Sequence, residues 1–88
     1  MANTTQLKQL CNNLDGSWDD VQLIGNTIYI YDTGVFCFTI TQNKNHFITN
    51  AIPLKQVITL NNITDVTAYI NTAWYMIFNT VIPNNAKL

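Results

Sequence analysis

Few side chains in this chain could carry out chemistry, and we first ask whether any of them converge. Asp15, Asp19 and Asp20 form the one local group of carboxylates. A general acid/base pair or a metal site needs such groups to meet in a cleft. Adjacent residues of a strand point to opposite faces of its sheet, so Asp19 and Asp20 diverge if they lie on a strand. The spacing predicts solvated loop acids and no metal site.

The possible nucleophiles and bases also stand alone in the sequence. His46 is the only histidine, and neither a cysteine nor a second histidine lies near it. Cys37 has no neighbouring cation or thiol that would lower its pKa. Ser17, the only serine, lacks the glycines of a nucleophile elbow. We therefore predict no catalytic residue and no cofactor, and we expect that the protein is not an enzyme.

The charge balance argues against nucleic acid as a partner. The chain has four Lys, no Arg and five Asp, with a net charge of -1. Binding a phosphate backbone needs a basic stripe, which four scattered lysines cannot form. The N-terminus has no apolar signal core, and no apolar run is long enough to span a bilayer. With two cysteines expected to be free thiols, these features predict a cytoplasmic protein that does not bind membranes.

The elements that position these residues are organised around a predicted antiparallel meander, residues 18–41. Gly25-Asn26 has the composition of a two-residue hairpin turn, which sets Leu23 opposite Ile28 and Val21 opposite Ile30. We interpret residues 32–34 as a three-residue loop with Gly in the left-handed position. That loop would place Ile30 opposite Phe36 and Ile28 opposite Phe38, so that one face of the sheet carries Val21, Leu23, Ile28, Ile30, Phe36, Phe38 and Ile40.

Helices are predicted on either side of the meander. Residues 4–14 carry leucines at helical spacing, with Asn3 as the expected N-cap, and residues 63–81 show a longer apolar repeat that Pro83 would close. After a turn at 42–45, residues 46–51 are expected to return as a fourth strand, with Phe47 opposite Ile40. Residues 53–60 are ambiguous: Pro53 suits the start of a helix and Val57-Ile58-Thr59 suits a strand. We predict a short helix there.

The predicted fold class is therefore α+β. It consists of an N-terminal helix, a three- to four-stranded antiparallel meander and a C-terminal helix packed on one face of the sheet. The length of 88 residues suits one domain, 1–88, with no linker or repeat to divide it.

The second face of the meander is the candidate working surface. Aromatic and uncharged side chains dominate it, and such patches are favoured at protein interfaces. The alternatives are ordinary cross-strand pairing at an exposed face, or coverage of the face by residues 53–60 or by the tail after Pro83. The predicted protein-interface residues are Tyr29, Tyr31, Val35, Cys37 and Thr39.

The order of helix, three strands and then helices resembles several compact phage-encoded inhibitors of host defence systems, including anti-CRISPR proteins. The resemblance is one of architecture, without a shared motif, and it implies a phage or mobile-element origin. We expect a small non-enzymatic protein that acts in the host cytoplasm through protein–protein contact. The alternative is a homo-oligomeric structural component, for example of a virion.

Overall fold

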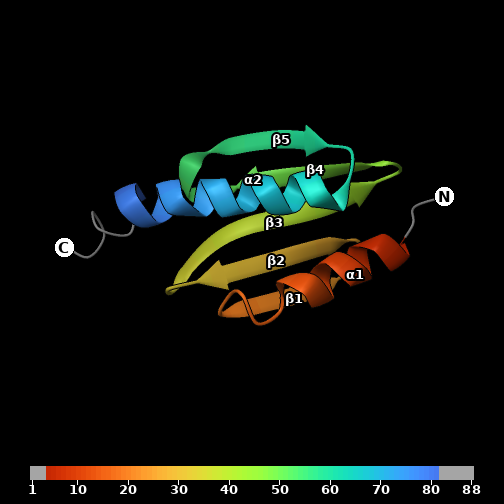
Figure 1. Cartoon of the computed structure of the whole chain (residues 1–88), viewed down its shortest axis with the longest axis horizontal. Helices are drawn as coiled ribbons and strands as arrows, with labels where there is room; N and C mark the ends of the chain where they lie inside the picture. Colours follow the sequence, from red (N-terminus) through yellow and green to blue (C-terminus); the bar gives the residue numbers. More distant parts are fainter. Residues whose placement is uncertain (1–3, 82–88) are drawn as a thin grey trace.

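The structure is a computed structural model that describes residues 4–81, and it has an α+β fold (Figure 1). A helix comes first, a five-stranded sheet follows, and a second helix ends the described chain. The elements are α1 (Thr4–Leu14), β1 (Asp20–Ile24), β2 (Thr27–Asp32), β3 (Val35–Asn43), β4 (His46–Ala51), the 3-10 turn η1 (Ile52–Leu54), β5 (Gln56–Leu60), α2 (Ile63–Met76) and the π-helical turn η2 (Ile77–Val81).

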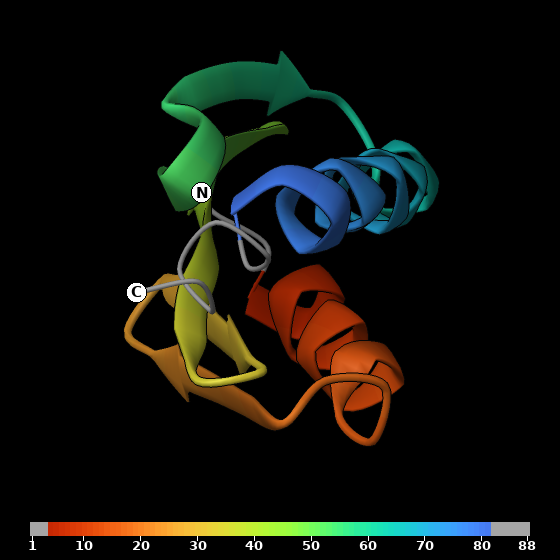
Figure 2. The same cartoon turned by 90° about the vertical axis from the view of Figure 1, so that its left-hand side faces the viewer.

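The strands follow one another across the sheet in chain order, and every neighbouring pair is antiparallel. Both helices lie on the same face of this meander (Figure 2). Alternate residues of each strand therefore point either towards the helices or to the opposite face, which we call the outer face. Within residues 4–81, no helix covers the outer face. The predicted layering, with the C-terminal helix on one sheet face, is confirmed.

The helix at 4–14 is confirmed, and its apolar stripe faces the core. Leu7, Leu10 and Leu14 are buried, while Cys11 beside them is partly buried. Gly16 follows in a left-handed conformation, with φ of +96°, and turns the chain towards Trp18. The predicted cap residue, Asn3, lies outside the described residues.

The first hairpin has the predicted register. Val21 pairs with Ile30 and Leu23 with Ile28, on either side of the Gly25-Asn26 turn. Gly25 has a φ of +63°, the conformation that a tight hairpin turn requires.

The second turn is shorter than predicted, and this changes the facing of two residues. Asp32 pairs with Val35, which leaves Thr33 and Gly34 as a two-residue turn with φ of 53° and 74°. The register then shifts by one: Tyr31 pairs with Phe36, but Ile30 pairs with Phe38. The extra residue is a β-bulge. The predicted pairing of Ile30 with Phe36 is therefore wrong, and Phe36 lies on the outer face.

The fourth strand is confirmed at 46–51, although its register differs from the prediction. Strand β3 continues to Asn43, which pairs with His46, so the turn consists of Lys44 and Asn45. Phe47 is buried on the core face as predicted, but it pairs with Gln42. Ile40, its predicted partner, pairs with Thr49.

The predicted helix at 53–60 is wrong, because most of this segment is the fifth strand. Pro53 lies in the short 3-10 turn η1, which Lys55 ends in a left-handed conformation with φ of 56°. The chain reverses there, and β5 pairs with β4 at the edge of the sheet. The β-branched run 57–59 therefore adopts the strand that its composition favours. This strand extends the sheet and does not fold across the outer face.

The second long helix is confirmed over 63–76 and continues as a π-helical turn to residue 81. Its start is capped by Asn62, whose Oδ1 accepts a 2.8 Å hydrogen bond from the amide of Asp65. The stripe that packs against the sheet is buried, and its members are Val66, Ile70, Ala73 and Ile77. The predicted closing residue, Pro83, lies outside the described residues.

Candidate functional site

The structure divides the five predicted interface residues into two groups. Tyr29, Tyr31 and Thr39 occupy outer-face positions of β2 and β3. Val35 instead packs against the core cluster, and Cys37 is fully buried within it. The bulge accounts for Cys37, because a three-residue loop without a bulge would have left it directly opposite Tyr29. The predicted placement of Val35 and Cys37 on the exposed face is therefore wrong.

Phe36 lies at the centre of the outer face, whereas the sequence analysis predicted it on the core face. Its ring stacks on Tyr31, with a centroid distance of 4.7 Å and an interplanar angle of 22°. The Phe36 ring also stacks on Tyr29, with a centroid distance of 6.2 Å and an interplanar angle of 28°. We call these three residues, Tyr29, Tyr31 and Phe36, the outer aromatic stack. Tyr31 remains 39 % exposed, so the stack is accessible.

Small and uncharged side chains surround the outer aromatic stack. The hydroxyls of Thr27 and Thr41 lie 3.0 Å apart across β2 and β3. Ile24 on β1 and Val57 on β5 are about 60 % exposed at opposite edges of the sheet. Among the outer-face positions of the five strands, Asp20 is the only Asp, Glu, Lys or Arg. The outer face is thus broad, nearly neutral and β-branched.

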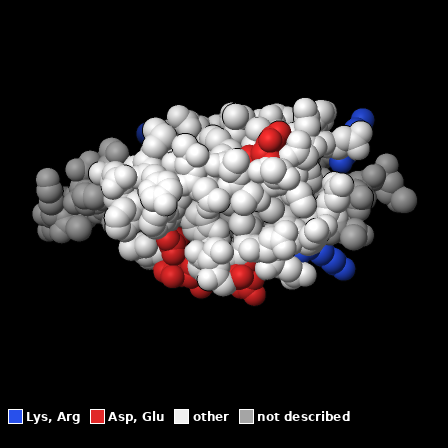
Figure 3. Space-filling model, in the orientation of Figure 1, with Lys and Arg blue, Asp and Glu red and all other residues white. Residues whose placement is uncertain are grey.

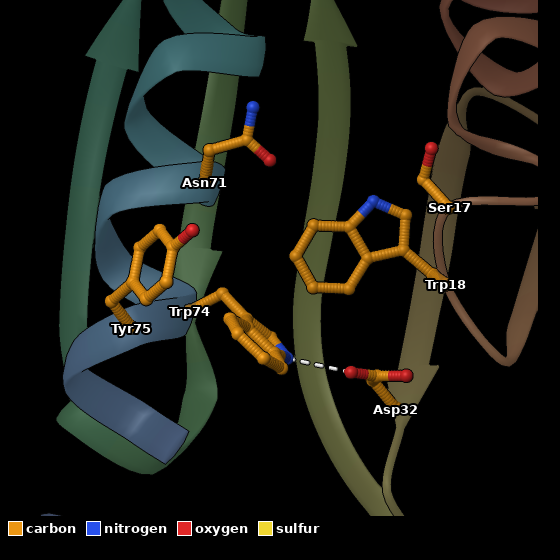
Figure 4. Close-up of a pocket in the computed structure, with 6 residues that line it drawn as sticks. All are labelled: Ser17, Trp18, Asp32, Asn71, Trp74 and Tyr75. Atoms are coloured by element: carbon orange, nitrogen blue, oxygen red, sulfur yellow. Dashed lines mark hydrogen bonds between the residues drawn. The ribbon is translucent and has the colours of Figure 1, made fainter. Parts of the chain in front are cut away.

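The other face of the fold carries a cavity of about 410 Å³ between α2 and the segment that precedes β1 (Figure 4). Trp74 in α2 donates a 2.6 Å hydrogen bond from its Nε1 to Oδ2 of Asp32, at the end of β2. This contact lies at one end of the cavity (Figure 4). The residues that line it are Ser17, Trp18, Asp32, Asn71, Trp74 and Tyr75. We call this the aromatic pocket.

Asp32 is fixed in the pocket by the turn beside it. Its Oδ1 accepts a 3.3 Å hydrogen bond from the amide of Asp19. The carboxylate of Asp19 in turn accepts a 2.8 Å hydrogen bond from the amide of Thr33. This reciprocal pair stabilises the positive φ of Thr33, and it leaves the Asp32 carboxylate directed towards Trp74.

Trp18 forms a deeper part of the same pocket. It is 8 % exposed and packs edge-to-face against Phe38, at 5.6 Å. Its Nε1 is buried and has no hydrogen-bond partner within the described part of the chain. An unpaired buried N–H costs about 1–3 kcal/mol, so this donor lowers the stability of the fold locally. The only sign of the aromatic pocket in the sequence was a tryptophan, Trp18, at the start of the predicted meander.

The acidic residues and the histidine that the sequence offers as catalytic candidates lie in different places in the fold. Asp20 is on β1, where its carboxylate accepts a 2.9 Å hydrogen bond from Gln22, whereas Asp19 is in the turn network. His46 Nδ1 lies 2.9 Å from Oδ1 of Asn61 at the far end of the sheet. Within residues 4–81, no three His, Cys, Asp or Glu side chains gather as a metal site would require.

Both thiols have a pKa that is raised above the ordinary value. Burial raises the pKa of Cys37 from its ordinary 9.0 to about 11, and the negative charges of Asp32 and Asp19 add to this effect. A hydrogen bond to the backbone of Asp32 opposes it. Burial also raises the pKa of Cys11, with a further contribution from Asp15. Neither thiol has the lowered pKa of a reactive nucleophile.

Comparison with known proteins finds no matching family model, no similar curated protein and no similar solved structure. Within the described residues, neither helix combines the length and the apolar character that crossing a membrane requires.

Proposed function

We propose that this protein acts without catalysis, by binding another protein through its outer face. The observation that carries the proposal is the one-sided layering of the fold. Both helices cover the same face of the sheet, so within residues 4–81 no helix lies over the outer aromatic stack, and the tail after Pro83 lies outside the described residues. Tyrosine and phenylalanine offer a large contact area at a small entropic cost, and aromatic residues are enriched at the centres of interfaces.

The chemistry of the face defines the partner surface that fits it. Asp20 is the only fully charged side chain among the outer-face positions, and it lies on the edge strand β1. A charged partner surface would lose its hydration at this face without gaining an opposite charge, which is costly. The partner surface that we propose is therefore flat, apolar and poor in charged residues. The proposal places the protein in the cytoplasm of a host cell, as a phage or mobile-element inhibitor of a host protein.

The double substitution Tyr29→Asp/Tyr31→Asp tests this proposal. We expect it to keep the fold, because both side chains point away from the helices, and to weaken partner binding about tenfold or more. The partner is first captured with the wild-type chain and then purified, and its affinity for each variant is measured by titration calorimetry. Met76→Asp is the matched control, because Met76 is 49 % exposed on α2, on the other side of the sheet. Equal affinities for the wild-type chain and the double variant would contradict the proposal.

A second candidate function, self-association, is favoured by strand β5. This edge strand, Gln56–Leu60, has neither a charged residue nor a proline, and its first four residues are exposed. Natural proteins usually protect such edges, because an open edge pairs readily with another strand. Two copies could pair β5 with β5 and form one continuous antiparallel sheet, as in a structural component.

Light scattering after size exclusion distinguishes the two functions. An assembly formed through β5 should dissociate on Val57→Lys, which places a charge on the edge, and should persist in the Tyr29→Asp/Tyr31→Asp variant. A wild-type chain that is monomeric at high concentration would exclude the structural component and leave the proposed binding function standing.

A further inference from the structure

The aromatic rings that line the aromatic pocket are nearly perpendicular to one another. Trp18 and Trp74 meet at an interplanar angle of 79°, with centroids 6.1 Å apart. Trp74 and Tyr75 meet at 73°, with centroids 5.4 Å apart. Phe78 stacks on Trp74 at 4.9 Å and holds that ring in place. Three rings at successive near-right angles, together with the Asp32 carboxylate, therefore border one cavity.

The electrostatic field at this pocket is negative. Asp32 lies in the lining itself, and Asp19 is hydrogen-bonded to it. Asp15 and Asp20 flank Trp18 in the sequence, and Asp15 forms a backbone bridge with Trp18. Figure 3 shows acidic side chains gathered mainly along the lower edge of this face, whereas the lysines lie towards the ends of the molecule. None of the six residues that line the pocket is basic.

The opposite end of the pocket is polar. The indole nitrogen of Trp18 is turned to the side on which the Asn71 amide and the Ser17 hydroxyl lie (Figure 4). Asp32 and the Trp74 nitrogen occupy the other end. The side chains of Asn71 and Ser17 are exposed and line the cavity, so they can hydrogen-bond a hydroxyl or carbonyl of a ligand at this end.

We infer that the aromatic pocket binds a small quaternary ammonium compound. The cation lies against the rings and Asp32, and a hydroxyl or carbonyl of the same ligand lies near Asn71 and Ser17. Aromatic faces attract cations through their quadrupole, and tryptophan and tyrosine do so most strongly. A methylated ammonium is easier to desolvate than a bare one and makes apolar contact with the rings. The volume of about 410 Å³ leaves room for the rest of a small ligand.

The inference goes beyond the outer face, because the pocket lies on the helix-covered side of the sheet. The ligand that we propose is a free quaternary ammonium compound, because a cavity of about 410 Å³ accommodates a whole small molecule. A choline headgroup of a phospholipid and a methylated lysine of a partner protein carry the same cation and are alternative outcomes of the test. The test therefore uses free choline, phosphatidylcholine vesicles and a trimethyl-lysine peptide as separate probes. Binding of free choline supports the inference, whereas binding of only the vesicles or only the peptide would overturn the assignment of a free small molecule.

The decisive measurement is a titration of the full chain, followed by tryptophan fluorescence, because Trp18 and Trp74 are its only tryptophans. Choline and tetramethylammonium should give saturable binding in the millimolar range. The neutral carbon isostere of choline, in which a tert-butyl group replaces the trimethylammonium group, should bind about tenfold more weakly or not at all. Equal binding of the isostere would overturn the inference and point to a pocket for neutral ligands. No saturable binding by any probe would also overturn it.

Variants locate the binding. Asp32→Asn keeps the side-chain size and an acceptor for Trp74 but removes the charge, so choline affinity should fall about tenfold. Tyr75→Ala should weaken choline binding, whereas Tyr75→Phe should retain it. Because the Tyr75 side chain is 62 % exposed, we expect both variants to fold. Tyr31→Ala, which removes an exposed ring from the outer face, is the matched control and should bind choline like the wild type. Unchanged choline binding by Tyr75→Ala and Asp32→Asn would place the ligand elsewhere and contradict the inference.

The outcome is separate from that of the proposed function. The Tyr29→Asp/Tyr31→Asp variant should bind choline normally even if it loses its protein partner. A chain that binds choline but no protein would support the inference and contradict only the proposed function.

Discussion

Trp74 and Asp32 are joined by a 2.6 Å hydrogen bond that spans 42 positions of the sequence and links α2 to the end of β2. The same carboxylate accepts a hydrogen bond from the amide of Asp19. The Asp32 side chain therefore links α2, β2 and the segment that leads into β1. Both donors lose their partner if Asp32 is shortened.

Asp32→Ala should therefore lower the free energy of unfolding by about 1.5–3 kcal/mol, the range for hydrogen bonds to charged groups. Asp32→Asn should cost clearly less, because its amide oxygen can still accept from Trp74. Urea unfolding followed by circular dichroism measures both values. Similar midpoints for the alanine variant and the wild type would mean that the two donors find water instead.

The bulge predicts losses of stability of different size for two phenylalanines of β3, Phe36 and Phe38. Phe38→Ala should cost about 3–5 kcal/mol, because Phe38 is fully buried between the sheet and the helices. Phe36→Ala should cost much less, because Phe36 lies on the outer face and is only partly buried. Thermal unfolding of the two variants compares them directly. A larger loss for Phe36→Ala would show that the register after the Thr33-Gly34 turn is different.

Thr49 offers a substitution that should stabilise the protein. Its side chain is fully buried on β4, and its Oγ1 has no hydrogen-bond partner within residues 4–81. Thr49→Val keeps the shape and removes the unpaired hydroxyl, so the free energy of unfolding should rise by about 1 kcal/mol. Thr49→Ser keeps the hydroxyl and should destabilise instead. A lower melting temperature for Thr49→Val would indicate that a water molecule satisfies the hydroxyl.

The raised pKa of Cys37 predicts a loss of stability in alkali. The folded chain holds this proton up to a pKa of about 11, whereas the unfolded chain releases it near 9.0. The contribution is therefore fully present below pH 9.0 and is lost as the pH rises towards about 11. Unfolding midpoints measured across this window should fall more steeply for the wild type than for Cys37→Ala. Parallel slopes for the two proteins would contradict the assigned burial of the thiol.

Sequence patterns predicted the parts of the fold that depend on local spacing. The helix at 4–14, the first hairpin with its register, and the helix from Ile63 each follow from apolar periodicity and a turn or cap residue nearby. Their physical determinants lie within a few positions of one another, so they can be recognised without knowledge of the tertiary structure.

The features that sequence reasoning missed depend on distant contacts. Thr33 adopts a positive φ that its own side chain does not favour, and the carboxylate of Asp19 in another segment stabilises it. The register of β3, and with it the facing of Phe36 and Cys37, depends on this two-residue turn together with the bulge opposite Ile30 and Tyr31. Residues 56–60 become a strand because the exposed edge of β4 pairs with them, which outweighs the helix signal of Pro53. The aromatic pocket likewise exists only once α2 lies on the sheet.

The contact between Trp18 and Trp74 also provides an intrinsic spectroscopic signal for the docking of α2. The two indoles come from the beginning and the end of the described chain and lie 6.1 Å apart only when α2 is docked beside the entry to β1. Their near-ultraviolet dichroism and emission therefore respond to this docking, while far-ultraviolet dichroism follows the helices and strands themselves. If the near-ultraviolet signal appears after the far-ultraviolet signal during refolding, the delay measures how long α2 takes to dock on a meander that has already formed.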